Sequence, residues 1–457
     1  MVIGSYRSAK DLVDPKNGKI SREIYVSEEI YAQELERVFA RAWLLVGHES
    51  QVPQPNDFFT SRMGEESVIL TRDRQGQVHV LLNTCMHRGM KVCRYDEGST
   101  PVFSCPYHGW SFSTDGKLVS VPGELIGVPQ FQTAYHGELA KNQWGLVHVP
   151  KMHNYNGWIW ACWDKDAPDF IDYLGDMKPF LDAGLNHPDG SEGGIEVIGG
   201  VHKWIFPGNW KFGAENFGGD HYHNISHRSV DMIGISDSGR KGRHNHDGLD
   251  LRSVRVNLSV PGGGHSSAGQ YFLGEDEPYV NGFATASPLV DEYFRHCHEE
   301  RKKRLGEKAR LHGGVGTVFP NTSFSAGRSI AVWHPAGPRV TEAWRWYFMP
   351  KDAPAEVKDV LRHYALRYAG PVGMTEQDDL ENWNYATEAS DGTQARRYPY
   401  NYQQGLRHDG DSPLAARLVT DSLLTEGTTE QNQRGSYWRW AEFMDAESWS
   451  ELRPPKK

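Results

Sequence analysis

Two short cysteine–histidine motifs constrain this sequence more than any other feature. The first is Cys85-Met-His87, and the second, Cys105-Pro-Tyr-His108, follows after seventeen residues. Each motif offers one thiolate and one imidazole from a tight turn, and both groups are metal ligands. Two such turns at the tips of neighbouring hairpins can converge on one metal centre. The chain around them must therefore fold so that the two tips meet.

Two kinds of metal centre use two cysteines and two histidines. A structural Zn²⁺ takes them in a tetrahedron, whereas a Rieske [2Fe–2S] cluster binds one iron through cysteines and the other through histidines. Zinc sites pair like with like within each arm, but here each arm holds one of each. The mixed arms favour the Rieske cluster over zinc and over four unrelated buried side chains. Gly89 and Gly109 follow the two histidines closely, where a tight loop needs glycine.

Length and composition exclude several classes of protein. A chain of 457 residues predicts two or three domains. A net charge of −10 argues against nucleic-acid binding, which needs a basic face. Five cysteines in a chain this long exclude a disulfide scaffold. The first ten residues lack the apolar core of a signal peptide, and no apolar run is long enough for a membrane span. We expect a cytoplasmic protein with reduced thiols.

The spacing of turns and apolar residues divides the chain into three parts. Residues 40–163 consist of short β-rich runs between Gly- or Pro-bearing turns, which predicts a small all-β domain. From residue 164 to residue 457 helices alternate with strands, which predicts a larger α+β domain with an antiparallel sheet surrounded by helices. Residues 1–39 contain a helix that Ser27 can cap, and we expect this segment to pack with the larger domain.

Three local predictions concern the larger domain. Asp169–Lys178 is expected to be helical, with Pro179 ending the helix. Ser329–Trp333 and Glu342–Met349 are expected to be neighbouring strands. Residues 239–267 are rich in Gly, His and Arg, and they are expected to form a loop that could cover a pocket.

A second dense patch contains His223, His227 and Asp220. On a helix these residues would share one face, and two imidazoles at i and i+4 can chelate one ion. A carboxylate from elsewhere would complete a 2-His-1-carboxylate triad, which holds Fe²⁺ with open positions. The best candidate is the acidic run that contains Asp378 and Asp379, although such runs are commonly solvated helix faces. The patch could also be an exposed polar helix, but the upstream cluster motif favours a metal site.

Together these residues resemble the large (α) subunit of Rieske non-haem iron aromatic-ring-hydroxylating dioxygenases, the naphthalene and biphenyl dioxygenase group. The resemblance extends from about residue 40 to residue 385. The matching pieces are Trp43-Leu-Leu-Val-Gly-His48, Cys85-x-His87-Arg-Gly89, Cys105-Pro-Tyr-His-Gly-Trp110, Asn209-Trp-Lys211, Glu215-Asn-Phe-Gly-Gly-Asp-His-Tyr-His223, Gly316-Thr-Val-Phe-Pro-Asn321 and Glu376-Gln-Asp-Asp379.

The resemblance implies two cofactors and their ligands. The residues that would hold one Rieske [2Fe–2S] cluster are Cys85, His87, Cys105 and His108. The residues that would hold one mononuclear Fe(II) are His223, His227 and Asp379, with Asp378 as the alternative carboxylate.

The same resemblance implies roles for three residues beside the iron. Asp220 would link His223 to His108 of a neighbouring subunit and so bridge the two metals. Asn216 would lie near the iron, and Phe217 would line the substrate pocket.

The implied activity is that of a terminal oxygenase that adds both atoms of O₂ to an aromatic ring. Electrons would come from NAD(P)H through a reductase and a ferredoxin. The assembly would be α₃, or α₃β₃ with a small β subunit, because the electron route crosses between subunits. The sequence leaves open a monooxygenase or O-/N-demethylase with the same metals, a Rieske electron carrier without the mononuclear iron, and a zinc-stabilised structural protein. Only three residues separate His223 from His227, fewer than in the better-known members, so the aromatic substrate stays open. We expect a neutral hydrocarbon, because the sequence places no Arg or Lys unambiguously in the pocket.

Overall fold

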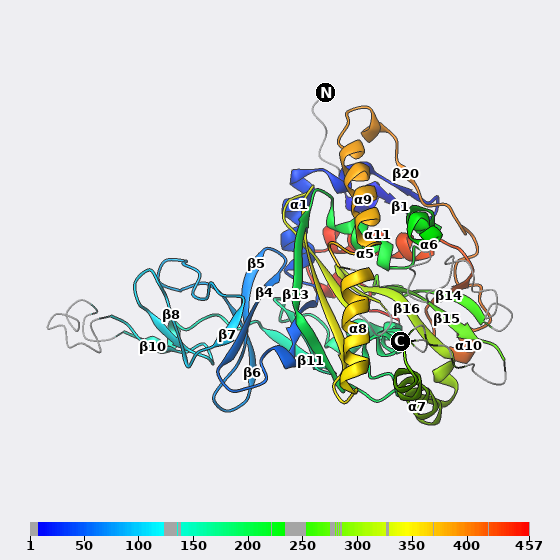
Figure 1. The fold of residues 1–457 in the computed structure, drawn as a ribbon. Helices are drawn as coiled ribbons and strands as arrows, with labels where there is room; N and C mark the ends of the chain where they lie inside the picture. Colours follow the sequence, from blue (N-terminus) through cyan, green and yellow to red (C-terminus); the bar gives the residue numbers. More distant parts are fainter. Residues whose placement is uncertain are drawn as a thin grey trace. The chain divides into compact units, whose positions relative to one another are not determined.

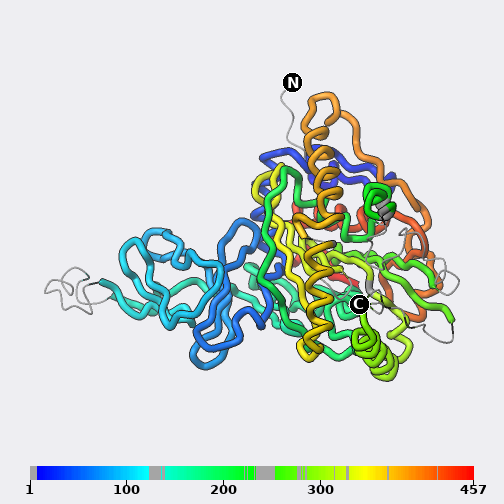
Figure 2. Tube along the Cα trace, in the orientation of Figure 1, coloured from blue at the N-terminus to red at the C-terminus, as the bar shows by residue number. Residues whose placement is uncertain are grey.

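The chain forms two compact units in a computed structural model (Figure 1). The smaller unit is Trp43–Lys165, and the larger unit combines Met1–Ala42 with Asp166–Lys457. The smaller unit is therefore inserted into the sequence of the larger one. The path of the chain can be followed in Figure 2. The residues that the structure describes are 8–122, 135, 139–220, 222–233, 253–274, 279, 281, 283, 286–325, 329–368, 370–418 and 420–456.

The smaller unit is built from short antiparallel strands. A four-stranded sheet has the order β6 (Val78–Leu82), β5 (Glu66–Arg72), β4 (Asp57–Met63), β7 (Glu97–Ser99). A three-stranded sheet has the order β10 (Leu118–Ser120), β9 (Ser111–Ser113), β8 (Val102–Ser104). Another has the order β11 (Lys151–Tyr155), β12 (Trp158–Cys162), β3 (Leu44–His48). The apolar side chains of the first two sheets form one core, in which Cys85 and Cys105 are buried.

The larger unit is organised around one eight-stranded antiparallel sheet. Its strands, in spatial order, are β13 (Ile195–Phe206), β19 (Thr341–Pro350), β18 (Ser329–Pro335), β17 (Thr322–Ser325), β16 (Leu311–Val318), β15 (Ser266–Phe272), β14 (Ser253–Ser259) and β21 (Leu423–Glu426). The strands predicted at 329–333 and 342–349 are confirmed as neighbours, with Ile330 opposite Trp346. A small sheet joins β1 (Val13–Asp14), β2 (Lys19–Ile20) and β20 (Tyr400–Asn401).

Helices surround the large sheet, which gives the α+β architecture that the sequence predicts. Those that contact it are α4 (Lys178–Leu185) on β16 and β17, α5 (Trp210–Phe217) on β16 to β18, α8 (Ala355–Tyr368) on β19, and α11 (Gln431–Asp445) on β14 and β15. The other α-helices of the described residues are α1 (Glu28–Glu34), α3 (Phe170–Leu174), α6 (Arg228–Ile233), α7 (Pro288–Leu305), α9 (Glu376–Ser390) and α10 (Ala415–Leu418).

Short 3₁₀ or π turns connect these elements. They include η1 (Ala9–Leu12), η2 (Arg22–Tyr25), η3 (Leu35–Phe39), η4 (Glu49–Gln51), η5 (Lys141–Gln143), η6 (Gly175–Met177), η7 (Tyr222–His227), η9 (Gly306–Arg310), η10 (Ala395–Arg397) and η11 (Trp449–Glu451). Within the described parts of the chain, no helix is both long and apolar enough to cross a membrane.

Two of the local predictions are wrong. Pro179 does not end a helix but lies in the first turn of α4, where its missing N–H costs no hydrogen bond. The predicted loop is wrong for residues 253–259, which form β14, and for residues 266–267, which begin β15; residues 260–265 form the glycine-rich turn that joins these strands. The alternation of Val254, Val256 and Leu258 with polar residues is the strand signal that the glycines obscured. The rest of that predicted loop, residues 239–252, lies outside the described residues.

Candidate metal centres

The two cysteine–histidine motifs lie in loops that have the same backbone hydrogen bonds. In each loop the cysteine N–H donates to the carbonyl oxygen five residues later, at 2.8 Å. Its carbonyl oxygen accepts from the glycine N–H four residues later, at 2.9 Å. Gly89 and Gly109 both have a φ of +71°, the left-handed region that favours glycine, which confirms the reason expected for them. The sequence thus builds two matching tight loops.

These loops bring the four predicted cluster ligands together. Cys85 and Cys105 are 2% and 3% exposed, and the ring centroids of His87 and His108 are 4.6 Å apart. Burial, with a further contribution from the Cys105 thiol beside it, raises the pKa of the Cys85 thiol. His87 Nδ1 is buried and has no hydrogen-bond partner among the described residues. A partnerless buried imidazole nitrogen beside two buried thiols fits the donor set of a Rieske cluster.

Sequence reasoning missed Asn83 and gave no role to Trp110, the residues that support the two loops. Asn83 is 1% exposed and precedes the first loop. Its Oδ1 accepts from the N–H groups of Val92 and Cys93 at 3.0 and 2.8 Å, and its Nδ2 donates to Cys93 O at 2.7 Å. The Trp110 ring stacks on His87 with centroids 5.0 Å apart and planes 3° apart. A polar residue at the end of the apolar strand β6 was the available signal for Asn83.

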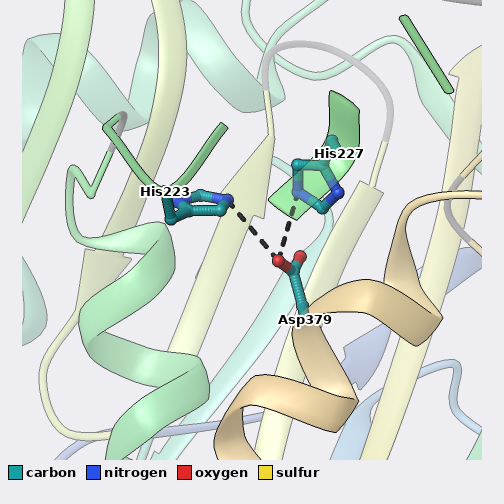
Figure 3. Close-up of side chains that lie close together, drawn as sticks. All are labelled: His223, His227 and Asp379. Atoms are coloured by element: carbon teal, nitrogen blue, oxygen red, sulfur yellow. Dashed lines mark ion pairs between the residues drawn. The ribbon is translucent and has the colours of Figure 1, made fainter. Parts of the chain in front are cut away.

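The second patch forms a three-residue cluster between η7 and α9. Figure 3 shows both imidazoles directed at Asp379, whose Oδ1 lies 3.5 Å from His223 Nε2 and 3.1 Å from His227 Nε2. Potential ligand atoms of these three residues lie within 4.8 Å of one another. The two histidines come from a 3₁₀ segment rather than from the α-helix that the spacing predicted. The Ser226 hydroxyl donates to His223 O at 2.8 Å and satisfies a carbonyl in this tighter turn.

The opposite nitrogen of each imidazole faces an oxygen acceptor. His223 Nδ1 contacts the backbone oxygen of Asp220, and His227 Nδ1 lies 3.1 Å from Asp378 Oδ2. Since these oxygens can only accept, each Nδ1 carries a proton, and each Nε2 faces Asp379. Two imidazole nitrogens and a carboxylate that converge in this way can bind one cation. The donor set is the one that suits non-haem Fe(II).

The acidic neighbours also affect the protonation of His223. Burial alone would lower its pKa, but the hydrogen bond to Asp220 and the charge of Asp379 outweigh burial and raise it. Asp220 is half-buried, and its Oδ1 accepts from His223 N at 3.3 Å. The structure therefore places Asp220 against the histidine to which the sequence analysis linked it.

Asn216 and Phe217 lie at the end of α5, just before Asp220. Asn216 is 8% exposed. The Phe217 ring lies 5.6 Å from the Trp333 ring and 5.3 Å from the guanidinium carbon of Arg345. Neither residue belongs to the three-residue ligand cluster described above.

A buried ion pair beneath α9 was also missed by sequence reasoning. The guanidinium of Arg345, on β19, binds both carboxylate oxygens of Glu376 at 2.6 and 3.0 Å. Burial raises the pKa of Glu376 to about 7, against the opposing effect of Arg345 and with a smaller rise from Asp379. Glu376 lies one helical turn before Asp379, so this pair fixes the helix end that carries the carboxylate. The sequence signals were a lone arginine in the aromatic strand 344–348 and the presence of Glu376 in the matching piece that ends at Asp379.

Models of two known families match the chain in the regions of these two clusters. Residues 42–132 match the Rieske [2Fe-2S] domain. Residues 191–417 match the ring hydroxylating alpha subunit (catalytic domain). The first match contains both cysteine–histidine loops, and the second contains the cluster of His223, His227 and Asp379.

Similar proteins cover nearly the whole chain. Biphenyl 2,3-dioxygenase subunit alpha of Rhodococcus jostii (strain RHA1) is 38% identical over 456 residues, which cover 97% of this chain and 92% of that protein. Benzene 1,2-dioxygenase subunit alpha of Pseudomonas putida is 35% identical over 451 residues, with 97% and 94% covered. The crystal structure of naphthalene 1,2-dioxygenase from Rhodococcus sp. bound to indole superposes with a TM-score of 0.82 at 31% identity, covering 97% of this chain and 98% of that one.

Proposed function

Because this chain belongs to the family of ring-hydroxylating dioxygenase alpha subunits, we propose that it is the terminal oxygenase that converts an arene and O₂ into a cis-dihydrodiol. The reaction consumes two electrons and two protons and places both oxygen atoms on the ring. A Rieske domain implies a [2Fe–2S] cluster, and the catalytic family implies a mononuclear iron. The observation that carries the proposal is the presence of both donor sets in one chain.

Each metal group has a proposed set of ligand residues in this chain. Those of the [2Fe–2S] cluster are Cys85, His87, Cys105 and His108. Those of the mononuclear Fe(II) are His223, His227 and Asp379. When bound, the cluster supplies single-electron transfer and the Fe(II) supplies O₂ activation.

The protein side chains supply geometry and exclude water. The buried ring of His227 and the buried carboxylate of Asp379 hold their ligand atoms in fixed directions on η7 and α9. The ion pair of Arg345 with Glu376 anchors α9 one turn before Asp379. A ligand set held this rigidly needs little reorganisation during reaction, which is how a protein scaffold assists a metal.

Asp220 is the proposed link between the two kinds of site. Its backbone oxygen and carboxylate already contact His223 within one chain. We propose that its carboxylate also binds His108 of a second copy of the chain, so that electrons cross between subunits. The expected assembly is a trimer of this chain, alone or with a small β subunit, and the expected electron donors are a ferredoxin and its NAD(P)H-dependent reductase.

The substrate proposed for this site is a neutral aromatic ring. Phe217 is partly exposed at the end of α5 and offers aromatic surface there, and the buried Trp333 ring packs against it. The charge of Arg345, which touches Phe217, is already compensated by the two-point contact with Glu376. A substrate carboxylate would have to compete with that buried pair, so an apolar ring is the better fit.

Product analysis under ¹⁸O₂ tests the proposed function. The purified protein, with its cluster and Fe(II), is supplied with a ferredoxin, a reductase and NADH, and is screened against biphenyl, naphthalene and benzene. A product that carries two labelled oxygens on adjacent ring carbons is the expected result. A single labelled oxygen, or loss of a methyl group from an ether or amine substrate, would instead assign a monooxygenase or demethylase. A protein that holds a cluster but no further iron would be an electron carrier.

A further inference from the structure

His227 lies between two consecutive carboxylates of α9. Its Nε2 is 3.1 Å from Asp379 Oδ1, and its Nδ1 is 3.1 Å from Asp378 Oδ2. Neighbouring residues on an α-helix project about 100° apart. The two aspartates therefore reach the two different nitrogens of one imidazole, and they do not converge on the same point.

We propose that Asp378 is the positioning residue of the iron site: it fixes the tautomer and the ring orientation of His227, while Asp379 alone serves as the carboxylate ligand. This inference rests on the proposed function, because it assumes that Fe(II) binds at Nε2. A carboxylate can only accept a hydrogen bond, so Asp378 requires the proton on Nδ1. The proton on Nδ1 leaves the lone pair on Nε2 for the metal.

The contrast in burial supports this division of roles. The side chain of His227 is 2% exposed, whereas that of Asp378 is 28% exposed and that of Asp379 is 9% exposed. Water has little access to a ring this buried, so Nδ1 needs a protein acceptor. Asp378 keeps part of its carboxylate in solvent, which reduces the cost of holding a second negative charge beside Asp379.

The geometry also argues against Asp378 as the iron ligand. Asp379 Oδ1 lies within 3.5 Å of the Nε2 atoms of both histidines, whereas the contact of Asp378 is to Nδ1 of His227. The two nitrogens of an imidazole point away from each other. A group bonded to Nδ1 therefore cannot bind the ion that Nε2 binds.

His227 is also the histidine for which this role can be tested. The Nδ1 of His223 is held by the backbone oxygen of Asp220, which no substitution removes. The Nδ1 of His227 is held by a side chain. Replacing Asp378 thus changes the orientation of one ligand while every proposed ligand atom stays in the chain.

The experiment measures metal binding in full-length protein that retains its cluster. The mononuclear metal is removed with a chelator, and Fe(II) is titrated back without oxygen. Asp378→Ala is expected to weaken Fe(II) binding by about 10- to 100-fold, the usual effect of losing a partner of a ligand histidine. Asp378→Asn keeps an acceptor oxygen and is expected to recover part of that loss. Co(II), used as a spectroscopic probe, is expected to show shifted visible bands in Asp378→Ala.

Two further variants make the result specific. Asp352→Ala removes a carboxylate that lies 2.9 Å from Nε2 of His187, a histidine that is not a proposed Fe(II) ligand, and is expected to leave Fe(II) binding unchanged. Asp379→Ala removes the proposed ligand and is expected to abolish binding. Wild-type affinity in Asp378→Ala would overturn the inference. So would a loss as complete as that of Asp379→Ala with no recovery in Asp378→Asn, or an equal loss in Asp352→Ala. Failure of the wild-type protein to bind Fe(II) would instead overturn the proposed function.

Discussion

Glu215 shows how much a single carboxyl group depends on its neighbours. It lies on α5 beside Asn216, and its Oε2 accepts a hydrogen bond from the Tyr402 hydroxyl at 2.9 Å and another from Tyr437. Burial raises the pKa of Glu215 from 4.5 to about 8, although both phenols act in the opposite direction. Near neutral pH this side chain is therefore largely an uncharged acid.

The raised pKa gives the wild-type protein a pH-dependent stability. Between pH 4.5 and about 8 the folded chain keeps the Glu215 proton while the unfolded chain releases it. Stability due to this group therefore falls as the pH rises through that window. Glu215→Gln removes the effect, so the variant should gain stability relative to wild type from pH 5 to pH 8, by at most about 5 kcal/mol.

Calorimetric melting temperatures at several pH values check this expectation. Glu447→Gln, at a carboxyl whose side chain is 74% exposed, serves as the control and should track the wild type throughout. Melting curves of Glu215→Gln that stay parallel to wild type across the window would contradict the raised pKa.

At the scale of elements, α11 holds the end of α5 in place. Gln433 Nε2 donates to Glu215 O at 3.3 Å, and Asn432 Nδ2 donates to Gly218 O at 2.7 Å. Gly219, at a φ of +131°, has no room for a Cβ, which would lie 2.6 Å from Asn432 Nδ2. Side chains of α11 thus satisfy carbonyls that a helix end leaves open, immediately before Asp220. This helix follows the stretch 191–417 that matches the catalytic family.

Asn432→Leu is expected to disturb the iron site from a distance. It leaves Gly218 O and Ser267 O without their donor, at a cost of about 1–3 kcal/mol. The turn before Asp220 should then shift, and the protein should retain less Fe(II) per chain. Asn257→Leu is the matched control, since Asn257 is equally buried and donates to carbonyls at β21. The iron content per chain and the melting temperature are measured for both variants. An equal loss of iron in Asn432→Leu and Asn257→Leu would mean that the substitutions only destabilise the fold in general.

Asn83 has the corresponding role in the smaller unit. It ties Val92 and Cys93 to the end of β6 and so closes the first cluster loop. Asn83→Leu should lose cluster, seen as lower visible absorbance and less acid-labile sulfide per chain. Asn154→Ala, at a more exposed amide on β11 that donates to Glu49, should keep both at wild-type levels. Full cluster content in Asn83→Leu would show that the loop closes without this amide.

Local patterns predicted the elements whose signals are local. The strands around Ile330 and Trp346 were identified because alternation and β-branched or aromatic residues mark them. Pro179 was misread because the same residue stops one helix and suits the first turn of the next. The strand that begins at Ser253 was hidden by the glycines of its hairpin turn. Contacts such as Asn432 to Gly218 join residues 214 positions apart and have no local pattern.

At the scale of the molecule, the two proposed metal sites lie in different compact units. Both cluster loops belong to the smaller unit, and η7 and α9 belong to the larger one. Spacing and residue type singled out in advance histidines and cysteines that the fold brings together, because each motif is short. The different positions of Asp378 and Asp379 could not be predicted, because only the fold shows which nitrogen of His227 each carboxylate faces.

Because the two proposed metal sites lie in separate units, we expect each site to bind its metal independently of the other. Cys105→Ser removes one proposed cluster ligand and should abolish the visible spectrum of the cluster. Fe(II) binding at His223, His227 and Asp379 should persist with an affinity close to wild type, because none of these residues belongs to the unit that is altered. Anaerobic Fe(II) titration of the variant measures this. Loss of both metals together, in a variant whose larger unit still melts cooperatively, would contradict independence.

The interrupted path of the chain has a consequence for modularity. The segment of the larger unit that precedes the insertion is hydrogen-bonded to the C-terminal region. Arg41 Nη1 donates to Ala446 O at 3.0 Å, and Trp449 Nε1 donates to Arg41 O at 3.1 Å. The two segments of the larger unit are therefore held together by their own contacts, and not only by the chain that runs through the smaller unit. An exchange of residues 43–165 for the corresponding unit of a relative is therefore expected to leave the larger unit folded, so each unit should accept sequence changes independently of the other.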